Sequence, residues 1–243
     1  RGGLIRVREF TMKDAYSFHE NREDLAAYYK RAHQAYVRIF RRVGLNECLS
    51  IQSDSGMMGG SVSHEFMAVA DCGEDTLFVS PDGSYKANRE VATSPVALDD
   101  SAPMSLEKVH TPGKKTIEEV AEFLGVDTAH TGKAVFYRDG DDNLIFVMVR
   151  GDIEVNEAKL RKVLRTPELT FAADDSIRAA GAEPGYASLL DLDPDRVRIV
   201  VDRTAADSAN LVVGANEADY HFRNFNYRRD AEVGEVVDIA TVR

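Results

Sequence analysis

The chain has 243 residues, of which 44% are hydrophobic and 29% charged, a composition typical of a globular protein with one large or two modest domains. Its net charge of −11 argues weakly against a nucleic-acid partner, and no apolar run approaches the roughly 20 residues that span a bilayer. Cys48 and Cys72 lack the spacing of a metal site and fit a reducing compartment. We therefore expect a cytoplasmic protein with no membrane partner and no bound metal in a zinc-type site.

The charge is unevenly distributed along the chain. Residues 1–44 carry ten Lys/Arg and five Asp/Glu, a net charge of +5, whereas the remainder carries a net charge of −16. Such an asymmetry suggests that the first segment meets an anion. A single solvated basic helix is the alternative, and the composition alone favours it.

The first 44 residues predict a strand followed by a long helix. Near-alternation over residues 4–18 predicts the strand and places four side chains on one of its faces: Phe10, Met12, Asp14 and Tyr16. Asn21 can cap the helix, an apolar stripe runs along it, and Gly44 is a natural stop.

A glycine-rich segment, SDSGMMGGSVSHEF, covers residues 53–66 and leads into an apolar, strand-like run. The chain has no P-loop lysine and no dinucleotide-binding fingerprint. Small residues allow the backbone to approach a ligand or a neighbouring strand closely, although a simple turn is the alternative. Short strands are expected at 65–70 and 76–80.

Residues 92–112 are rich in Pro, Ser, Ala and Asp, which predicts a linker and a domain boundary after residue 91. A second α+β unit follows. Thr116 and Glu119 form a capping box that opens a short helix ending at Gly125. Its other expected elements are a hairpin over 133–150 with DGDD as the turn, a helix over 156–164, and strands over 196–204 and 221–227.

Several blocks of this sequence resemble bacterial-type prolyl-tRNA synthetases. GLIRVREFTMKDAYSFH resembles the second half of class II motif 2 in that family, and SDSGMMGGSVSHEF with ADCGEDTLF resembles its glycine loop and following strand. The blocks from TPGKKTIEEV through LIFVMVRGDIEVNEAKL to VVDRT and VGANEADYHF resemble the family's inserted editing domain, which also exists as free-standing proteins. The resemblance runs nearly end to end.

The resemblance implies an α+β fold in two parts. A partial class II synthetase catalytic domain, built on an antiparallel sheet, is expected at residues 1–91. A smaller, YbaK-like α+β editing domain is expected at 92–232, and residues 233–243 are expected to return to the catalytic domain. Motif 1, the first strand of motif 2, motif 3 and the anticodon-binding domain have no counterpart in this sequence, so we expect the chain alone not to form prolyl-adenylate.

For the whole enzyme, the resemblance implies a homodimeric proline–tRNA ligase that uses ATP with Mg²⁺ to charge tRNA(Pro) with proline. It also implies hydrolytic editing of mischarged Ala-tRNA(Pro), without a cofactor, by the inserted domain. Alanine is smaller than proline, and each missing methylene contributes only about 1–3 kcal/mol of discrimination, so a second sieve is needed. The alternatives are a tRNA-binding or regulatory relative without catalysis and a purely structural domain.

In the synthetase part, the resemblance implies an ATP site and an amino-acid pocket. Arg6 would reach the phosphates and Phe10 would stack on adenine; the structural alternatives are a solvated charge and a core side chain. One side of the pocket would be formed by Met12, Asp14, Tyr16 and Phe18 on one strand face. His64, which follows the glycine loop, would line another side. Asp14 could face the imino group of proline or pair with an arginine. For His64, a hydrogen-bonded structural role is the commoner alternative.

In the editing part, the resemblance implies three catalytic positions and a pocket edge. Lys133 would hold the terminal phosphate or polarise the ester, Asp202 would orient water or the ribose, and His221 would filter the amino acid by size. Thr111 and Gly185 would complete the pocket. The structural alternatives are an exposed lysine for Lys133 and a helix N-cap for Asp202.

One turn departs from the family pattern. The family has a Gly-Ser-rich turn ending in Gly-Pro, whereas this chain reads EPGYASLLDLD. Pro184 and Gly185 fit the pattern, but Tyr186 and Ala187 alter it. The resemblance implies that this turn supplies backbone N–H groups to the ester oxygen, so the departure bears on both activity and specificity. No Ser-His-Asp or Cys-His arrangement offers another mechanism.

Overall fold

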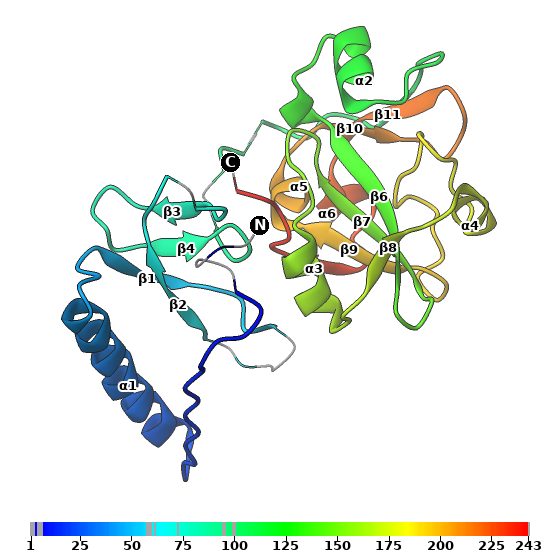
Figure 1. The fold of residues 1–243 in the computed structure, drawn as a ribbon. Helices are drawn as coiled ribbons and strands as arrows, with labels where there is room; N and C mark the ends of the chain where they lie inside the picture. Colours follow the sequence, from blue (N-terminus) through cyan, green and yellow to red (C-terminus); the bar gives the residue numbers. More distant parts are fainter. Residues whose placement is uncertain are drawn as a thin grey trace. The chain divides into compact units, whose positions relative to one another are not determined.

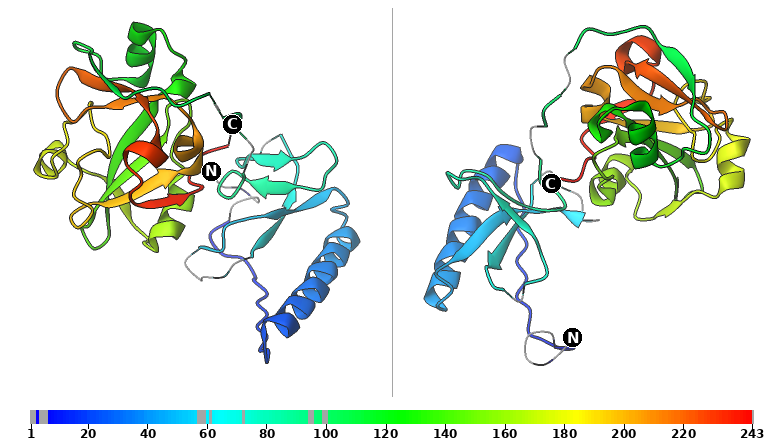
Figure 2. Two further views of the ribbon diagram at one scale, coloured as in Figure 1. Left: turned by 180° about the vertical axis from the view of Figure 1, so that it is seen from behind. Right: turned by 90° about the horizontal axis from the view of Figure 1, so that it is seen from above.

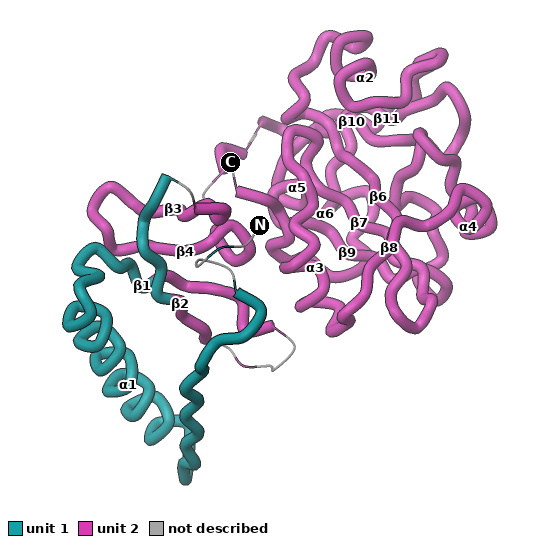
Figure 3. The backbone as a smooth tube through the Cα atoms, viewed as in Figure 1, with its two compact units in different colours: residues 1–50, 66–71 teal, residues 51–65, 72–243 magenta. Residues whose placement is uncertain are grey.

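The computed structural model describes residues 3, 7–56, 60, 62–71, 73–93, 96–98 and 101–242. The chain divides into two compact units, residues 1–50 with 66–71 and residues 51–65 with 72–243 (Figure 3). This division falls at other residues than the expected boundary after residue 91, which stays a prediction about domains. None of the helices in the described part of the chain is both long and apolar enough to cross a membrane.

The first unit is organised by one long helix, α1 (Arg22–Arg42), which confirms the expected helix (Figure 1). The Asn21 side chain caps it by accepting a hydrogen bond of 2.9 Å from the backbone N–H of Asp24. Gly44 follows its end with a φ of 92°, a conformation that glycine adopts without strain. The ring of Phe66 packs against the helix, with its centroid 5.2 Å from that of Phe40.

The expected strand over residues 4–18 is absent from the part that the structure describes. Residues 7 and 9–19 have no regular secondary structure, and residues 4–6 lie outside the described residues. The side chains of Phe10 and Tyr16 are 69% and 83% exposed. A strand needs a neighbour to satisfy its backbone donors and acceptors, and alternation of side chains cannot supply one.

A small sheet is formed by β1 (Cys48–Gln52), β2 (His64–Ala68), β3 (Leu77–Val79) and β4 (Lys86–Asn88), in the order β2-β1-β4-β3. The strands β2 and β3 confirm the two short strands expected from the sequence, whereas β1 and β4 were not expected. In the glycine-rich segment, the Ser53 N–H donates to the carbonyl of Ser63 at 3.1 Å. The segment is therefore closed at its base; residues 57–59 and 61 of it lie outside the described residues.

The α+β fold expected for the second half of the chain is confirmed (Figure 1). Its elements are β5 (Glu107–His110), α2 (Ile117–Leu124), the short 3-10 helix η2 (Thr128–His130), β6 (Gly132–Asp139), β7 (Leu144–Arg150), α3 (Glu157–Leu164), β8 (Leu169–Phe171), α4 (Asp174–Ala179), β9 (Arg198–Asp202), α5 (Arg203–Asp207), β10 (Leu211–Gly214), β11 (Tyr220–Phe225), α6 (Tyr227–Asp230) and β12 (Glu235–Val237). They form a five-stranded sheet, β12-β9-β7-β6-β8, and a three-stranded sheet, β10-β11-β5.

The central strand β7 holds the core of this region together. All seven of its residues are buried, as expected for a strand that is covered on both faces, and the first six are apolar. Ile145, Val147 and Val149 pack in one cluster with α3, while Phe146 and Met148 pack in another with residues of α5, β10 and β11. Figure 2 shows the sheet with these elements around it from two further directions.

Most elements of this region were predicted correctly from short sequence patterns. Thr116 and Glu119 form the expected capping box, and Gly125 ends α2 with a φ of 65°. The hairpin of β6 and β7, the helix α3 and the strands β9 and β11 are also confirmed. In the described part of the expected linker over 92–112, the composition concealed the strand β5, which pairs with β11 along Tyr220↔His110 to Arg223↔Glu107.

Candidate active site

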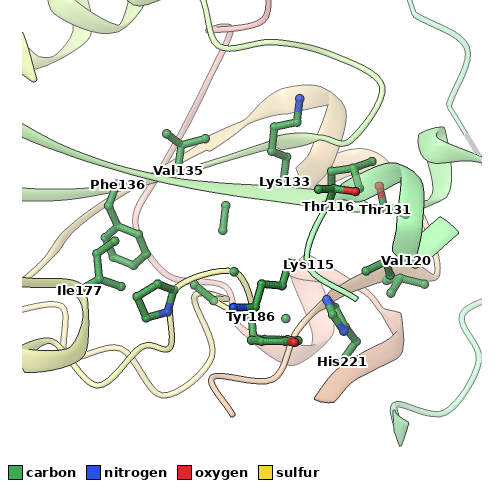
Figure 4. Close-up of a pocket in the computed structure, with 18 of the residues that line it drawn as sticks. Lys115, Thr116, Val120, Thr131, Lys133, Val135, Phe136, Ile177, Tyr186 and His221 are labelled. Atoms are coloured by element: carbon green, nitrogen blue, oxygen red, sulfur yellow. The ribbon is translucent and has the colours of Figure 1, made fainter. Parts of the chain in front are cut away.

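A pocket of about 580 Å³ opens between β6, the start of α2, the turn at 184–187 and the strands β10 and β11 (Figure 4). Its walls carry side chains of different character. The apolar ones include Val120, Val135, Phe136 and Ile177, and the polar ones include Lys115, Lys133, Glu154 and His221. A volume of this size fits the range of about 300–1,000 Å³ in which proteins bind small ligands.

Lys133 projects from β6 at the edge of the pocket. The strand is fixed by its pairing with β7, in which Lys133 lies across from Val149. The Lys133 ammonium donates to Glu154 Oε1 at 2.6 Å, and its side chain is 22% exposed. The cation expected on this strand is therefore present in the pocket and partly neutralised by a carboxylate that is itself 72% exposed.

Thr111 and His221 form a buried polar pair next to the pocket. The Thr111 hydroxyl oxygen lies 2.6 Å from Nδ1 of His221, and the two residues are 0% and 5% exposed. Burial lowers the pKa of His221 to about 4, so the imidazole is neutral at pH 7. His221 lines the pocket and therefore presents a bulky, uncharged surface to whatever enters.

Tyr186 is the residue through which the altered turn contributes to the pocket wall. Its hydroxyl donates to Asp219 Oδ1 at 2.7 Å, and the same oxygen accepts from the Gly113 N–H at 2.7 Å. Its ring centroid lies 5.6 Å from that of His221. Burial, followed by the hydrogen bond to Asp219, raises the pKa of Tyr186 to about 12, so the phenol stays neutral.

The turn at 184–188 is pinned by the chain that follows β10. Asn216 donates from its backbone to the Tyr186 carbonyl at 2.9 Å, and its side-chain oxygen accepts from the Ser188 N–H at 2.8 Å. Gly214 makes this close approach possible, since a Cβ there would lie 2.1 Å from the Tyr186 oxygen. The altered turn is therefore held in a fixed position at the side of the pocket by these contacts.

Reasoning from the sequence missed most residues that line the pocket, and three of them determine its shape and charge: Lys115, Tyr186 and Gly214. Tyr186 was noticed only as a departure from a pattern. The block VVGAN carried the one available signal for Gly214, because glycine in an apolar strand often marks close approach of another backbone.

Asp202 lies elsewhere. It is 1% exposed, its Oδ1 caps α5 by accepting from the Thr204 N–H at 2.8 Å, and its Oδ2 accepts from the Ile239 N–H at 2.8 Å. The residue lines a second cavity of about 680 Å³ together with Arg150 and Lys159. The structure thus shows Asp202 as the helix cap that the sequence left as an alternative and does not bring its carboxylate to the pocket beside Lys133.

The other expected pocket residues of the editing part are accounted for. Gly185 lines the pocket with a φ of 84°. Thr111 does not line it and instead contacts His221, with 2.6 Å between its hydroxyl oxygen and Nδ1. Burial raises the pKa of the Cys48 thiol, which disfavours its thiolate form; Cys72 lies outside the described residues. Over the described ranges, no three His, Cys, Asp or Glu side chains form a group suited to a metal ion.

The structure does not assemble the nucleotide and amino-acid sites expected in the first half of the chain. Arg6 lies outside the described residues. Phe10, Met12 and Tyr16 are 69%, 65% and 83% exposed on a segment without a strand, and Asp14 is exposed there too. His64 begins β2 and is half-buried. The strand that was expected to place these side chains on one face is absent from the described residues.

Two kinds of comparison bear on the function of this chain. A family model described as an aminoacyl-tRNA editing domain matches residues 111–230. The chain is 44% identical over 241 residues to a proline–tRNA ligase of Dehalococcoides mccartyi, which covers 99% of this chain and 42% of that protein. It is 41% identical over 246 residues to the proline–tRNA ligase of Bacillus subtilis (strain 168), which covers 100% of this chain and 43% of that protein.

The chain thus spans less than half the length of these curated relatives. A crystal structure of a hypothetical protein superposes with a TM-score of 0.50 and 20% identity, covering 56% of this chain and 92% of that one, and shows the fold alone. The class II character of the first half stays a prediction. Residues 111–230 match an aminoacyl-tRNA editing domain, and nearly the whole chain is homologous to part of the proline–tRNA ligases.

Proposed function

We propose that residues 111–230 hydrolyse the ester that links alanine to the 3′-terminal adenosine of mischarged tRNA(Pro). One observation carries the proposal: in the region that matches an editing domain, one pocket is lined both by a cation, Lys133, and by His221, a neutral, buried side chain paired with Thr111. The cation suits the polarised end of the substrate, and the neutral pair suits a small, uncharged side chain.

The size of the pocket supports a substrate larger than an amino acid. A volume of about 580 Å³ is in the range that holds drug-sized ligands, and it leaves room for the terminal nucleoside as well as the aminoacyl group. Discrimination then depends on the walls near the amino acid. His221 and Tyr186, whose ring centroids are 5.6 Å apart, narrow that end, which favours a methyl group over the pyrrolidine ring of proline.

The reaction requires water to attack the carbonyl carbon of the ester. The bond from that carbon to the ribose oxygen then breaks, the ribose oxygen takes up a proton, and free alanine and a free 3′-terminal hydroxyl leave. Negative charge develops on the carbonyl oxygen in the transition state, and a fixed cation nearby stabilises it. Lys133 on β6 is the cation that we assign to this role.

We also propose, from homology, the role of the whole protein to which such a sequence contributes. It would be a cytoplasmic homodimer that binds tRNA(Pro) and joins it to proline in an ATP-dependent reaction with Mg²⁺. ATP and Mg²⁺ would activate the proline carboxylate. The strand expected to carry Phe10 is absent from the described residues and Arg6 lies outside them, so we derive no step of that reaction.

The test is release of alanine from Ala-tRNA(Pro) by the 243-residue chain and by Lys133→Ala. We expect hydrolysis by the wild type and a loss of at least about 100-fold in the variant, because a charge-assisted contact of the transition state is removed. Lys162→Ala is the matched control, since Lys162 is 53% exposed on α3 and is not among the residues that line the pocket.

The competing reading is a tRNA-binding relative without catalysis. It predicts that the wild type binds Ala-tRNA(Pro) and releases alanine no faster than buffer does. That result would overturn the editing proposal, and equal activity in the wild type and Lys133→Ala would overturn the role of Lys133.

A further inference from the structure

Asp219 joins two segments that surround the pocket. It ends the loop between β10 and β11, and its Oδ1 accepts hydrogen bonds from the Tyr186 hydroxyl and from the Gly113 N–H, both at 2.7 Å. Its backbone carbonyl also accepts from the Thr111 N–H at 2.7 Å. The altered turn at 184–187 and the segment that leads to α2 are therefore tied to each other through this one residue.

The Tyr186 side chain is held at both of its ends. Its hydroxyl is bonded to Asp219, and its backbone carbonyl accepts from the Asn216 N–H at 2.9 Å. The residue is 2% exposed, and the Lys115 ammonium lies 5.7 Å from the centroid of its ring, within the range of a cation–π contact. The position of the ring is therefore set by contacts with several segments of the chain.

The hydrogen bond from Tyr186 to Asp219 joins a neutral donor to a charged acceptor, which is the stronger kind of hydrogen bond. Burial, followed by this bond, raises the pKa of Tyr186 to about 12, so the phenol keeps the proton that it donates. The hydrogen bonds from Gly113 and Tyr186 hold the pKa of Asp219 below its usual value, so the carboxylate is ionised at pH 7. Both partners therefore keep their roles at neutral pH.

The altered turn contributes an aromatic ring to the pocket, while two of its backbone donors are already engaged. The Tyr186 N–H donates to the Glu183 carbonyl at 2.9 Å, and the Ser188 N–H donates to Asn216 Oδ1 at 2.8 Å. The ring centroid of Tyr186 lies 5.6 Å from that of His221, and both residues line the pocket (Figure 4). This end of the pocket is therefore narrower than a turn of small residues would leave it.

We propose that Asp219 is a positioning residue that sets the substrate range of the editing site: by holding the Tyr186 ring near His221, it restricts the site to amino acids whose side chain is no larger than a methyl group. The inference rests on the proposed editing function. Asp219 is not among the residues that line the pocket, so it acts through Tyr186 and does not touch the substrate. Alanine then fits beside the ring, whereas larger side chains and the pyrrolidine ring of proline do not.

The test measures substrate range, because a general loss of structure would lower the activity toward every substrate alike. The substrates are tRNA(Pro) charged with alanine, with 2-aminobutyrate, which has one methylene more, and with proline. The proteins are the wild type, Tyr186→Phe, Asp219→Gly and the double variant. Tyr186→Phe removes only the hydroxyl, and Asp219→Gly removes the carboxylate while suiting the φ of 67° at this position.

For the wild type we expect kcat/KM with alanine to exceed that with 2-aminobutyrate by about tenfold or more, the factor that one methylene contributes in a tight pocket. Tyr186→Phe and Asp219→Gly should each lower this preference by at least about threefold and raise the release of proline. Because both changes break the same bond, the double variant should lower the preference no further than the single variants do. Asp219→Asn should keep the preference, since its amide retains an acceptor oxygen and asparagine tolerates this backbone conformation.

Glu217→Gln is the matched control for the charge. Glu217 lies in the same loop, pairs with Lys108 and is not among the residues that line the pocket, so its loss should leave the preference unchanged. If Asp219→Gly does not fold, Tyr186→Phe decides the question, because it keeps the ring and loses one hydroxyl.

Three results would overturn the assignment while leaving hydrolysis of Ala-tRNA(Pro) in place. These are an unchanged preference in Tyr186→Phe, additive losses of preference in the double variant, and a wild type that releases alanine, 2-aminobutyrate and proline equally well. Failure of the wild type to release alanine would instead overturn the proposed function, and the assignment with it.

Discussion

The Thr111 hydroxyl oxygen and Nδ1 of His221, 2.6 Å apart, form a polar pair sealed beside the pocket. Burial lowers the pKa of His221 to about 4 from its ordinary value of 6.5. Between these values the unfolded chain binds a proton that the folded chain does not. The contribution of His221 to stability is therefore complete above pH 6.5 and is lost as the pH falls toward 4, by up to about 3 kcal/mol.

We expect urea unfolding of the wild type to show this loss between pH 6.5 and 4 and His221→Gln to show a shallower one. All other titrating groups are shared by the two proteins, so the difference between their curves reports His221. Parallel curves over this range would contradict a neutral, buried histidine.

Gly214→Ala is expected to displace the turn that walls the pocket. The new Cβ would lie 2.1 Å from the Tyr186 carbonyl oxygen and 2.4 Å from that of Ala187. Both distances are far shorter than a contact between non-bonded atoms, so the backbone would have to move. We expect a loss of about 1–3 kcal/mol in the free energy of unfolding and at least about a tenfold fall in deacylation per folded molecule. Thermal unfolding and alanine release measure the two effects.

Gly140→Ala is the control for this change, because the nearest atom to a Cβ at that position is 3.7 Å away. It should alter neither quantity beyond the usual range of a surface substitution, about 0.5 kcal/mol. An active and stable Gly214→Ala protein would show that the turn is free to move.

Glu154→Gln is expected to increase the electrostatic attraction of Lys133 for negative charge in the pocket, because it removes the carboxylate that pairs with this lysine. The pair is 2.6 Å apart but Glu154 is 72% exposed, so its loss should change stability by less than about 1 kcal/mol. With the opposing charge removed, kcat/KM for Ala-tRNA(Pro) should rise about two- to fivefold at low salt, and the gain should shrink as salt is added.

Glu157→Gln is the matched variant, since Glu157 is 41% exposed, pairs with Arg161 and is not among the residues that line the pocket. It removes the same charge and should leave kcat/KM nearly unchanged. A fall in activity of Glu154→Gln would show that this carboxylate instead holds Lys133 in its working position.

Features set by neighbouring residues could be predicted from the sequence. The capping box of Thr116 and Glu119, the stop at Gly125 and the buried run of β7 depend on side chains and backbone within a few positions. The expected strand over 4–18 failed because pairing requires a partner strand, which alternation does not reveal. β5 was concealed in the same way, since its stability comes from β11, about 110 residues later.

The same contrast between local and long-range features applies to the candidate site. Lys133 and His221 were found because they lie in blocks that resemble a known family, and the structure places both in one pocket. The bond from Tyr186 to Asp219 spans 33 positions, and the packing of Lys115 over Gly185 spans 70, so neither follows from local pattern. A buried carboxylate such as Asp202 gives the same sequence signal whether it reacts or caps a helix.

Asp202→Asn separates these two roles. Asp202 accepts three hydrogen bonds: its Oδ1 accepts from the Thr204 N–H at 2.8 Å and from the Thr204 hydroxyl, and its Oδ2 accepts from the Ile239 N–H at 2.8 Å. An amide can keep only one acceptor oxygen, so one buried N–H loses its partner or faces the new NH₂ group. We expect a loss of about 1–3 kcal/mol in the free energy of unfolding.

Deacylation by the folded fraction of Asp202→Asn should stay within about threefold of the wild type, because the carboxylate lies outside the pocket that holds Lys133. Asp195→Asn removes the same charge at an exposed position and should change neither quantity. Urea unfolding measures the first effect, and alanine release at a temperature where both variants are folded measures the second. A folded Asp202→Asn protein that has lost 100-fold or more in activity would return Asp202 to the catalytic residues, because a cap on α5 alone cannot produce that loss.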